Sequence, residues 1–328
     1  MKPLTPQLTV VMVTPTTYET CRTTLRFLRQ QTVCEEIELI IVCPCVEELK
    51  PDTEEIDPFW GYQFIALDTL ASNGTAIAAG IRAAKAPIVV YGEEHSYPTP
   101  EWAARLIARH QEPYAAVGYA MGNANPNTLT SWAHLYGQFG AVVEPVTPGP
   151  ATVLGGHHTS YKRALLLDFG EMLAQMMDNE CALHIALRAR GHALFLENVV
   201  SNHVNISQWT SYCLLDYIGQ RGFAAARFSA GRWSWSRRLF YAAASPLIPF
   251  VRLLRIRGHL IRTGRNKQFA PQIYLQIVPA LLCGAWGEAL GYLLGEAPTN
   301  HQKKIKFELD RYAHITPQDR KALREANA

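Results

Sequence analysis

The hydrophobic positions of residues 1–120 alternate between short continuous runs and helical spacing. Continuous apolar runs with β-branched residues at 8–14, 37–43 and 87–91 are typical of buried parallel strands, and residues 62–66, with a weaker pattern, and 114–119 predict two more strands. Apolar residues at helical spacing predict helices between them, at 17–31, 75–84 and 101–110. This alternation predicts an α/β fold with a doubly wound, mostly parallel sheet, which binds ligands at the carboxyl ends of its strands.

The pattern changes after residue 120. Pro145, Pro148 and Pro150 predict a mobile loop that would be placed to cover a site. Helical spacing at 161–190, interrupted near Gly170, predicts two helices, and residues 193–200 are typical of a last strand. A helix over 207–229 then leaves the core. We therefore expect a ligand-binding domain at 1–206 and a C-terminal helical region at 207–328.

Charge separates the C-terminal region from the rest of the chain. Residues 217–287 contain 11 Lys and Arg and no Asp or Glu, whereas the remaining residues carry 20 Lys and Arg against 28 Asp and Glu. Apolar stretches at 239–251 and 273–294 are interrupted by prolines and polar residues. Because a spanning helix needs about 20 clean apolar residues, we expect helices that lie on or dip into an anionic membrane surface. A buried helical hairpin or an oligomer interface is the alternative.

Composition narrows the setting further. Apolar residues dominate between the charges of 217–287, which favours lipid over nucleic acid as the partner. The seven cysteines form neither a CxxC pair nor a zinc-ligand spacing, and residues 1–7 lack the basic and apolar regions of a signal peptide. We therefore expect reduced thiols and a protein at the cytoplasmic face of the cell membrane, peripheral or monotopic.

Candidate chemistry lies directly after the fourth predicted strand. Glu93, Glu94 and His95 follow the run at 87–91, at the edge where a doubly wound sheet places its ligand. Carboxylate oxygens suit Mg²⁺ or Mn²⁺, and a metal there would neutralise a diphosphate. A solvated acidic turn is the alternative interpretation of the same residues.

Motifs of one known family follow in order along residues 8–205. They are Thr14-Pro15-Thr16, Gln31-Thr32, the strand at 38–42, Asn73-Gly74-Thr75, Glu93-Glu94-His95, Pro100-Glu101-Trp102, the segment GGHHTSYKR at 155–163, and Asp178-Asn179-Glu180. In this order and spacing they resemble family 2 glycosyltransferases of the GT-A fold, in their membrane-associated subgroup. The resemblance implies an inverting hexosyltransferase that moves a sugar from a nucleotide-sugar donor to a lipid-linked or saccharide acceptor.

The resemblance also assigns roles to individual residues. The residues implied in binding the nucleotide sugar are Thr14, Pro15, Thr16, Asn73, Glu93 and Glu94. Those implied in holding a divalent metal, Mg²⁺ or Mn²⁺, are Glu94, His95 and His203. Glu180 is the expected catalytic base and Asp178 the second candidate, at the start of a helix whose dipole favours a carboxylate. The alternatives are an ordinary helix-terminal carboxylate for Glu180, a structural His203, and a helix-capping Asn73.

Three positions depart from the family pattern. The acidic motif is Glu93-Glu94-His95 in place of Asp-x-Asp, which makes the donor set softer. Cys43-Pro44-Cys45 stands where the family has an Asp that binds the base of the nucleotide, so recognition of the base must differ. In the acceptor segment, His158 stands in place of an Asn.

Two other functions are compatible with parts of this pattern. A nucleotidyltransferase on the same architecture would need a Gly-rich, basic loop after the first strand, but residues 14–19 contain no Gly, Lys or Arg. A non-catalytic, membrane-tethered binding module derived from a glycosyltransferase is the alternative from a different class, because the acidic motif is altered and the second-strand Asp is missing.

Overall fold

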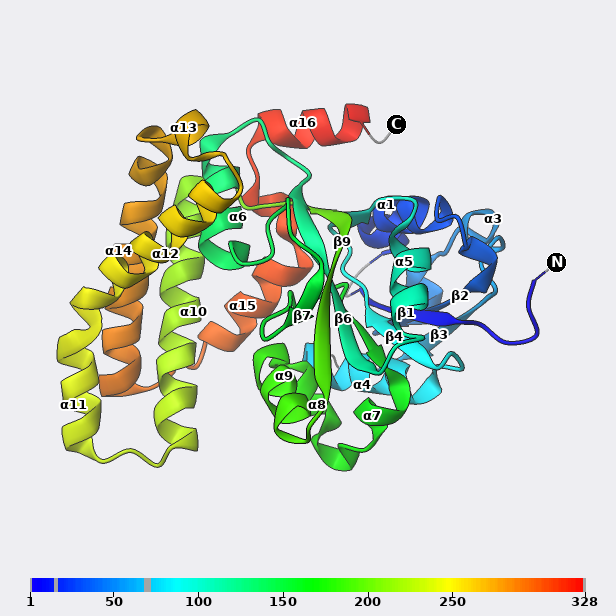
Figure 1. Ribbon diagram of the computed structural model, residues 1–328, viewed down its shortest axis with the longest axis horizontal. Helices are drawn as coiled ribbons and strands as arrows, with labels where there is room; N and C mark the ends of the chain where they lie inside the picture. Colours follow the sequence, from blue (N-terminus) through cyan, green and yellow to red (C-terminus); the bar gives the residue numbers. More distant parts are fainter. Residues whose placement is uncertain (1, 15–16, 68–71, 327–328) are drawn as a thin grey trace. The chain divides into compact units, whose positions relative to one another are not determined.

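The computed structural model of the chain describes residues 2–14, 17–67 and 72–326 (Figure 1). The chain divides into two compact units. An α/β unit is formed by Met1–Gly122 and Glu144–His203, and a helical unit by Asn123–Val143 and Val204–Ala328. The segment 123–143 therefore belongs with the C-terminal helices. The domain division expected after residue 206 stays a prediction.

A mixed sheet forms the centre of the α/β unit, with strands in the order β3-β2-β1-β4-β8-β6-β9-β5 and β7 paired with β9. The bounds are β1 Leu8–Val13, β2 Ile37–Cys43, β3 Gly61–Ala66, β4 Ile88–Tyr91, β5 Ser96–Pro98, β6 Tyr114–Asn123, β7 Gly149–Ala151, β8 Ser160–Lys162 and β9 Ala193–His203. Strands β3, β2, β1 and β4 are parallel, whereas β8 runs antiparallel to β4 and β6. The predicted α/β class with a mostly parallel sheet and C-terminal helices is confirmed.

The parallel strands explain why the sequence signal is strong in this half of the unit. Every residue of β1 and β2 is buried, so both strands consist of continuous apolar runs instead of alternating ones. Leu8 is in register with Ile37 of β2 and Ile88 of β4. The carboxyl ends of the three strands therefore meet at one edge of the sheet, where the candidate site lies.

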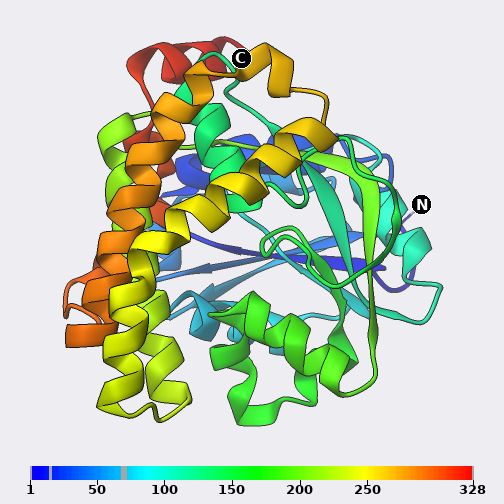
Figure 2. The same ribbon diagram turned by 60° about the vertical axis from the view of Figure 1, so that its left-hand side comes forward.

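Helices cover both faces of this sheet (Figures 1 and 2). On one face lie α1 Tyr18–Arg29 and α5 Trp102–Arg109, and on the other lie α4 Asn73–Ala83, α7 Arg163–Leu167, α8 Leu173–Met177 and α9 Glu180–Ala189. The short helices α2 Val46–Leu49 and α3 Thr53–Ile56 connect β2 to β3. Two 3₁₀ turns, Cys34–Glu36 and Gly170–Met172, complete the unit within the described residues.

The structure differs from the sequence prediction between residues 145 and 190. Strand β7 forms inside the predicted proline-rich loop, and β8 pairs between β4 and β6. The sequence did not reveal either strand, because three residues carry too few positions for a periodic signal. The interruption expected near Gly170 is present, and this residue adopts φ +54°, a left-handed conformation that glycine tolerates best.

The helical unit contains the remaining elements. They are α6 Leu129–Phe139, α10 Trp209–Ala230, α11 Trp235–Ala244, η3 Ser245–Leu247, α12 Ile248–Arg262, α13 Asn266–Phe269, α14 Gln272–Leu294, α15 Asn300–Leu309, η4 Arg311–His314 and α16 Pro317–Ala326. The long helices α10 and α14 lie side by side, and α11 and α12 also contact α14 (Figures 1 and 2).

Glycines on α14 let α10 approach its backbone closely. A β-carbon at Gly287 would lie 2.2 Å from the carbonyl oxygen of Tyr217, and one at Gly291 would lie 2.5 Å from that of Arg221. A buried ion pair joins α10 to α12, because the Arg252 guanidinium donates to both oxygens of Asp216 at 2.7 and 2.9 Å. Because the two charges neutralise each other through paired hydrogen bonds, both side chains can be buried.

Two helical stretches of the described chain are long and apolar enough to cross a membrane by length and composition: Trp235–Arg262 with 28 residues and Gln272–Leu294 with 23. In their most apolar windows, 22% and 44% of the residues are buried, respectively. Core helices of soluble proteins meet the same criterion. These helices are therefore compatible with spanning a membrane, lying on one, or packing in a protein.

Substitution of Gly287 by Ala should destabilise the protein by about 1–3 kcal/mol, because the new methyl group would overlap the Tyr217 carbonyl. Gly258→Ala is the matched control on exposed α12, where nothing lies within 4 Å of the added carbon, and it should stabilise the helix by about 0.5–1 kcal/mol. Denaturant unfolding of both variants measures the difference. Equal stability of Gly287→Ala and the wild type would contradict the close helix packing.

Candidate functional site

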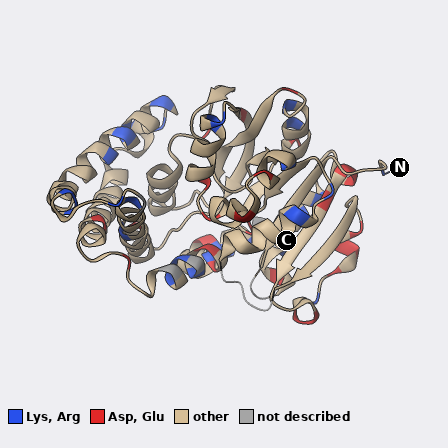
Figure 3. Cartoon of the chain, turned by 90° about the horizontal axis from the view of Figure 1, so that it is seen from below, with Lys and Arg blue, Asp and Glu red and all other residues tan. Residues whose placement is uncertain are grey.

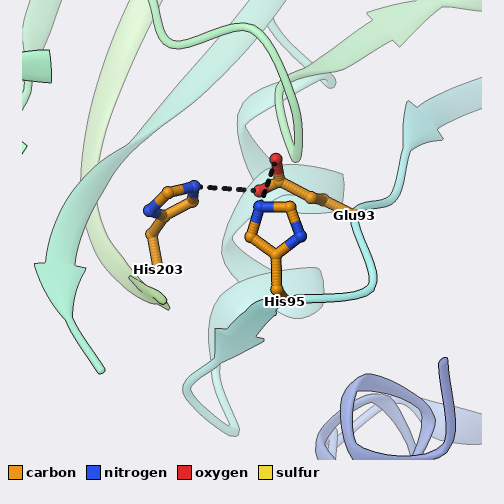
Figure 4. A group of neighbouring side chains, drawn as sticks. All are labelled: Glu93, His95 and His203. Carbon is orange, nitrogen blue, oxygen red and sulfur yellow. Dashed lines mark ion pairs between the residues drawn. The ribbon is translucent and has the colours of Figure 1, made fainter. Parts of the chain in front are cut away.

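The turn after β4 places the Glu93 carboxylate against three imidazoles. Its Oε1 atom lies 3.0 Å from Nε2 of His95, and its Oε2 atom lies 3.5 Å from Nε2 of His203 (Figure 4). Nδ1 of His157, from the loop between β7 and β8, also contacts Glu93 Oε1. Side chains from the turn between β4 and β5, from the end of β9 and from this loop therefore meet at one carboxylate.

Local constraints fix the conformation of this turn. The amide of Gly92 donates to the Val11 carbonyl at 2.8 Å, and a β-carbon on Gly92 would lie 2.4 Å from the sulfur of Met12. The Ser96 hydroxyl donates to Glu93 Oε2 at 2.7 Å. Since Ser96 is paired with His203 in the β5–β9 ladder, strand pairing also brings the two ends of the site together.

Glu93 stays ionised although it is buried. Burial by itself would raise the pKa of its carboxyl, but the neighbouring His157, His95 and His203 outweigh that effect and hold the pKa well below the usual value. The side chain of Glu93 is 4% exposed, so the negative charge faces groups of the protein and not bulk water. Such a carboxylate is prepared to bind a cation.

His158 anchors the loop that carries His157. It adopts φ +60°, its amide donates to the Tyr91 carbonyl at 2.8 Å, and its Nδ1 atom lies 3.2 Å from the Ser201 hydroxyl. Burial lowers the pKa of His158 to about 4, so the ring is neutral at physiological pH. Its aromatic neighbours are Trp102 and Tyr119, which gives this residue a packing role.

Glu180 lies on the other side of His157. It is the first residue of α9, and the side chain of Asn179 caps this helix by accepting from the Ala182 amide at 3.1 Å. Oε1 of Glu180 is 3.5 Å from Nε2 of His157, and the Glu180 side chain is 21% exposed. A β-carbon on Gly156 would lie 2.9 Å from the same oxygen, so a larger residue here would force the Glu180 carboxylate to shift.

The structure places the other predicted residues around the same edge, with different contacts. Asp178 accepts from the Gly74 amide at 2.7 Å, in the first turn of α4, whose first residue is Asn73 and whose N-cap is Ser72. Thr14 is buried directly after β1, and its amide donates to the Val42 carbonyl at 3.0 Å. The expected nucleotide contacts of Pro15 and Thr16 lie outside the described residues. All of these site assignments stay predictions.

The candidate metal group contains Glu93 as its acidic residue, whereas the sequence analysis expected Glu94. Among the described residues, Glu93, His95 and His203 offer ligand atoms that all lie within 4.8 Å of one another. Glu94, the expected ligand, is buried next in the chain but lies outside this group. One carboxylate oxygen and two imidazole nitrogens form a set of intermediate softness, which fits Mn²⁺ better than Mg²⁺.

Sequence reasoning did not identify the link between Glu93 and Glu180. His157 contacts both glutamates. In the sequence, His157 belongs to the GGHH segment, which resembled an acceptor-side loop and gave no sign of these contacts. The position of this loop follows from the pairing of β8 with β4 and β6, and that pairing has no local pattern.

The chain was compared with known proteins by sequence and by fold. No protein-family model matches the chain, and no curated protein matches it. Among solved structures, the mannosyltransferase PcManGT from Pyrobaculum calidifontis in complex with GDP-Man and Mn²⁺ is 15% identical, over 99% of this chain and 86% of that chain, with a TM-score of 0.46. S. aureus TarS 1–349 is 14% identical over 98% and 92%, with a TM-score of 0.43. Its complex with UDP is 15% identical over 89% and 93%, with a TM-score of 0.44. The family resemblance of the sequence stays a prediction.

Glu93→Gln should weaken Mn²⁺ binding by about 10–100-fold, since it removes the carboxylate charge from the His95–His203 group. Glu94→Gln is the matched control, and it should leave the affinity near that of the wild type. Electron paramagnetic resonance of free and bound Mn²⁺ measures both constants. Loss of binding in the Glu94 variant with retention in the Glu93 variant would reverse the assignment.

Proposed function

We propose that the chain is a glycosyltransferase that moves a hexosyl group from a nucleotide-sugar donor to a lipid-linked or saccharide acceptor. The observation that carries the proposal is the convergence of Glu93, His95 and His203 at the carboxyl edge of the parallel strands, with Glu180 nearby. In open α/β sheets this edge is the usual ligand site. A cation site and a separate, partly exposed carboxylate are the two groups that such a transfer requires.

The proposed reaction is a single in-line displacement with inversion. The acceptor oxygen forms a bond to the anomeric carbon, the bond from that carbon to the diphosphate breaks, and its electron pair leaves with the nucleoside diphosphate. Glu180 takes the proton of the acceptor hydroxyl as general base. A divalent cation held by Glu93, His95 and His203 would supply positive charge to the departing diphosphate.

The contacts of the two candidate bases favour Glu180. Asp178 already accepts a hydrogen bond from the Gly74 amide in the first turn of α4, and removing it would leave that amide without this partner. Glu180 is partly exposed and lies at the N-terminus of α9, where the helix dipole favours the carboxylate form. Donor binding is proposed at the ends of β1 and β2, with Thr14, Asn73 and the Cys43–Cys45 turn near the nucleotide.

We further propose that the helical unit holds the enzyme at an anionic membrane surface, on the cytoplasmic side. Large apolar side chains that are more than half exposed follow one another along α11, η3 and α12: Trp235, Leu239, Phe240, Leu247, Phe250, Val251, Leu254 and Ile261. Asp and Glu are absent from 217–287, so these two helices carry only basic charges (Figure 3). Apolar side chains with interspersed arginines suit a lipid surface.

Arginine–aromatic contacts lie where α10 passes to α11. The guanidinium of Arg237 lies 4.1 Å from the ring centre of Trp233, and that of Arg238 lies 3.9 Å from that of Trp235. Tryptophan and arginine together are typical of the headgroup region of a bilayer. This arrangement supports an interfacial position more directly than the length of the helices does.

A screen of UDP-, GDP- and other nucleotide sugars with Mn²⁺ or Mg²⁺ tests the transferase proposal. The wild type should release nucleoside diphosphate from at least one donor, and Glu180→Gln should lower kcat by about 10²–10⁴-fold with donor binding retained. Glu171→Gln, at an exposed position of the 3₁₀ turn, is the control and should keep full activity. A folded wild type that turns over no donor would favour the alternative, a non-catalytic membrane-tethered binding module.

Flotation with liposomes tests the membrane proposal. The full chain should float with anionic vesicles and less with zwitterionic ones, and added salt should weaken the binding. Phe240→Ser combined with Leu254→Ser should lower the partition constant about tenfold or more, because each buried apolar side chain contributes about 1.5–3 kcal/mol. Ile185→Ser, an equally exposed apolar position on α9, should have no effect. Unchanged flotation of the double variant would refute the proposal.

A further inference from the structure

His157 lies between the carboxylate of the candidate metal site and the proposed catalytic base. Its Nδ1 atom contacts Oε1 of Glu93, and its Nε2 atom lies 3.5 Å from Oε1 of Glu180. The two ring nitrogens therefore face two different carboxylates from opposite ends of one rigid imidazole. The His157 side chain is 22% exposed, so it lines the accessible part of the site.

The fold holds this imidazole in place. The ring of Tyr91 meets it edge to face, with ring centres 4.4 Å apart. The neighbouring His158 fixes the loop, because its backbone amide donates a hydrogen bond to the Tyr91 carbonyl. The Thr159 hydroxyl closes the turn by donating to the Gly155 carbonyl at 2.7 Å. The left-handed backbone of His158 costs on the order of 1 kcal/mol, a strain that is typical of functional turns.

The space for Glu180 is provided by the same loop. A side chain at position 156 would overlap the Glu180 carboxyl group, so Gly156 permits the contact between His157 and Glu180. Two carboxylates that approach one site repel each other unless a donor lies between them. The imidazole of His157 lies between the two carboxylates, with one ring nitrogen facing Glu93 and the other facing Glu180.

We propose that His157 is a positioning residue that orients the Glu180 carboxylate toward the acceptor hydroxyl and uses Glu93 as its support. This inference rests on the proposed transferase function. A base must be held within a fraction of an ångström of its productive position, and a misplacement of about 1 Å costs on the order of 10²-fold in rate. Loss of His157 should therefore lower kcat without a matching change in the KM of the donor.

Two side chains that each reproduce one ring nitrogen separate the two contacts. The amide nitrogen of Asn corresponds to Nδ1 and reaches Glu93, whereas that of Gln corresponds to Nε2 and reaches Glu180. His157→Gln should keep kcat within about tenfold of the wild type, and His157→Asn and His157→Ala should lose about 10²-fold. Donor KM, Mn²⁺ affinity by electron paramagnetic resonance, and thermal stability should stay near the wild-type values in the Gln and Asn variants.

Several results would overturn the inference. Activity retained in His157→Asn and lost in His157→Gln would show that His157 acts through Glu93 and not through Glu180. Full activity in all three variants would show that His157 has no role in the reaction. A loss of Mn²⁺ affinity that parallels the loss of kcat would assign the residue to the metal. If His157→Ala does not fold, the comparison of Asn with Gln still decides. A wild type without turnover refutes both the transferase proposal and this inference, whereas an active enzyme with unaffected variants refutes the inference alone.

Discussion

The candidate site depends on a buried negative charge at Glu93. Removing a carboxylate from water costs several kcal/mol unless partners replace the lost solvation. The Ser96 hydroxyl at 2.7 Å and the imidazoles of His95, His203 and His157 provide those partners. They come from the turn after β4, from β5 and β9, and from the loop after β7, so the charge is satisfied only when the parallel and antiparallel parts of the sheet are both formed. The need to stabilise the Glu93 charge thereby links the assembly of the sheet to the chemistry of the site.

The same charge explains the proposed division of labour between two carboxylates. Glu93 is 4% exposed and faces imidazoles, which suits a role in holding a cation. Glu180 is 21% exposed and lies at a helix N-terminus, which suits contact with an entering acceptor. His157 separates the two groups, so the negative charges can lie close together without direct repulsion. Environment, and not residue type, assigns different roles to two glutamates.

The helical unit differs from the α/β unit in what it buries and what it exposes. Its interior contains close backbone contacts at Gly287 and Gly291 and the ion pair of Asp216 with Arg252, whereas α11 and α12 expose large apolar side chains. The interior also contains apolar side chains, such as Ile256, Leu260 and Ile277, so the unusual feature of this unit is the apolar area that α11 and α12 expose. A lipid surface would remove that exposed apolar area from water. Association with a membrane is therefore proposed from exposure and charge together.

Local pattern by itself determined the parallel half of the sheet and the position of the acidic motif. Strands buried on both faces are continuous apolar runs, and the residues after β4 must lie at the ligand edge. Only the tertiary structure decided that Glu93 and not Glu94 faces His95 and His203, because both glutamates are buried and the antiparallel pairing of β5 with β9 brings His203 beside Glu93. The place of His157 was likewise decided by the pairing of β8 between β4 and β6. Contacts between residues far apart in sequence depend on such long-range pairing, which no short stretch of sequence encodes.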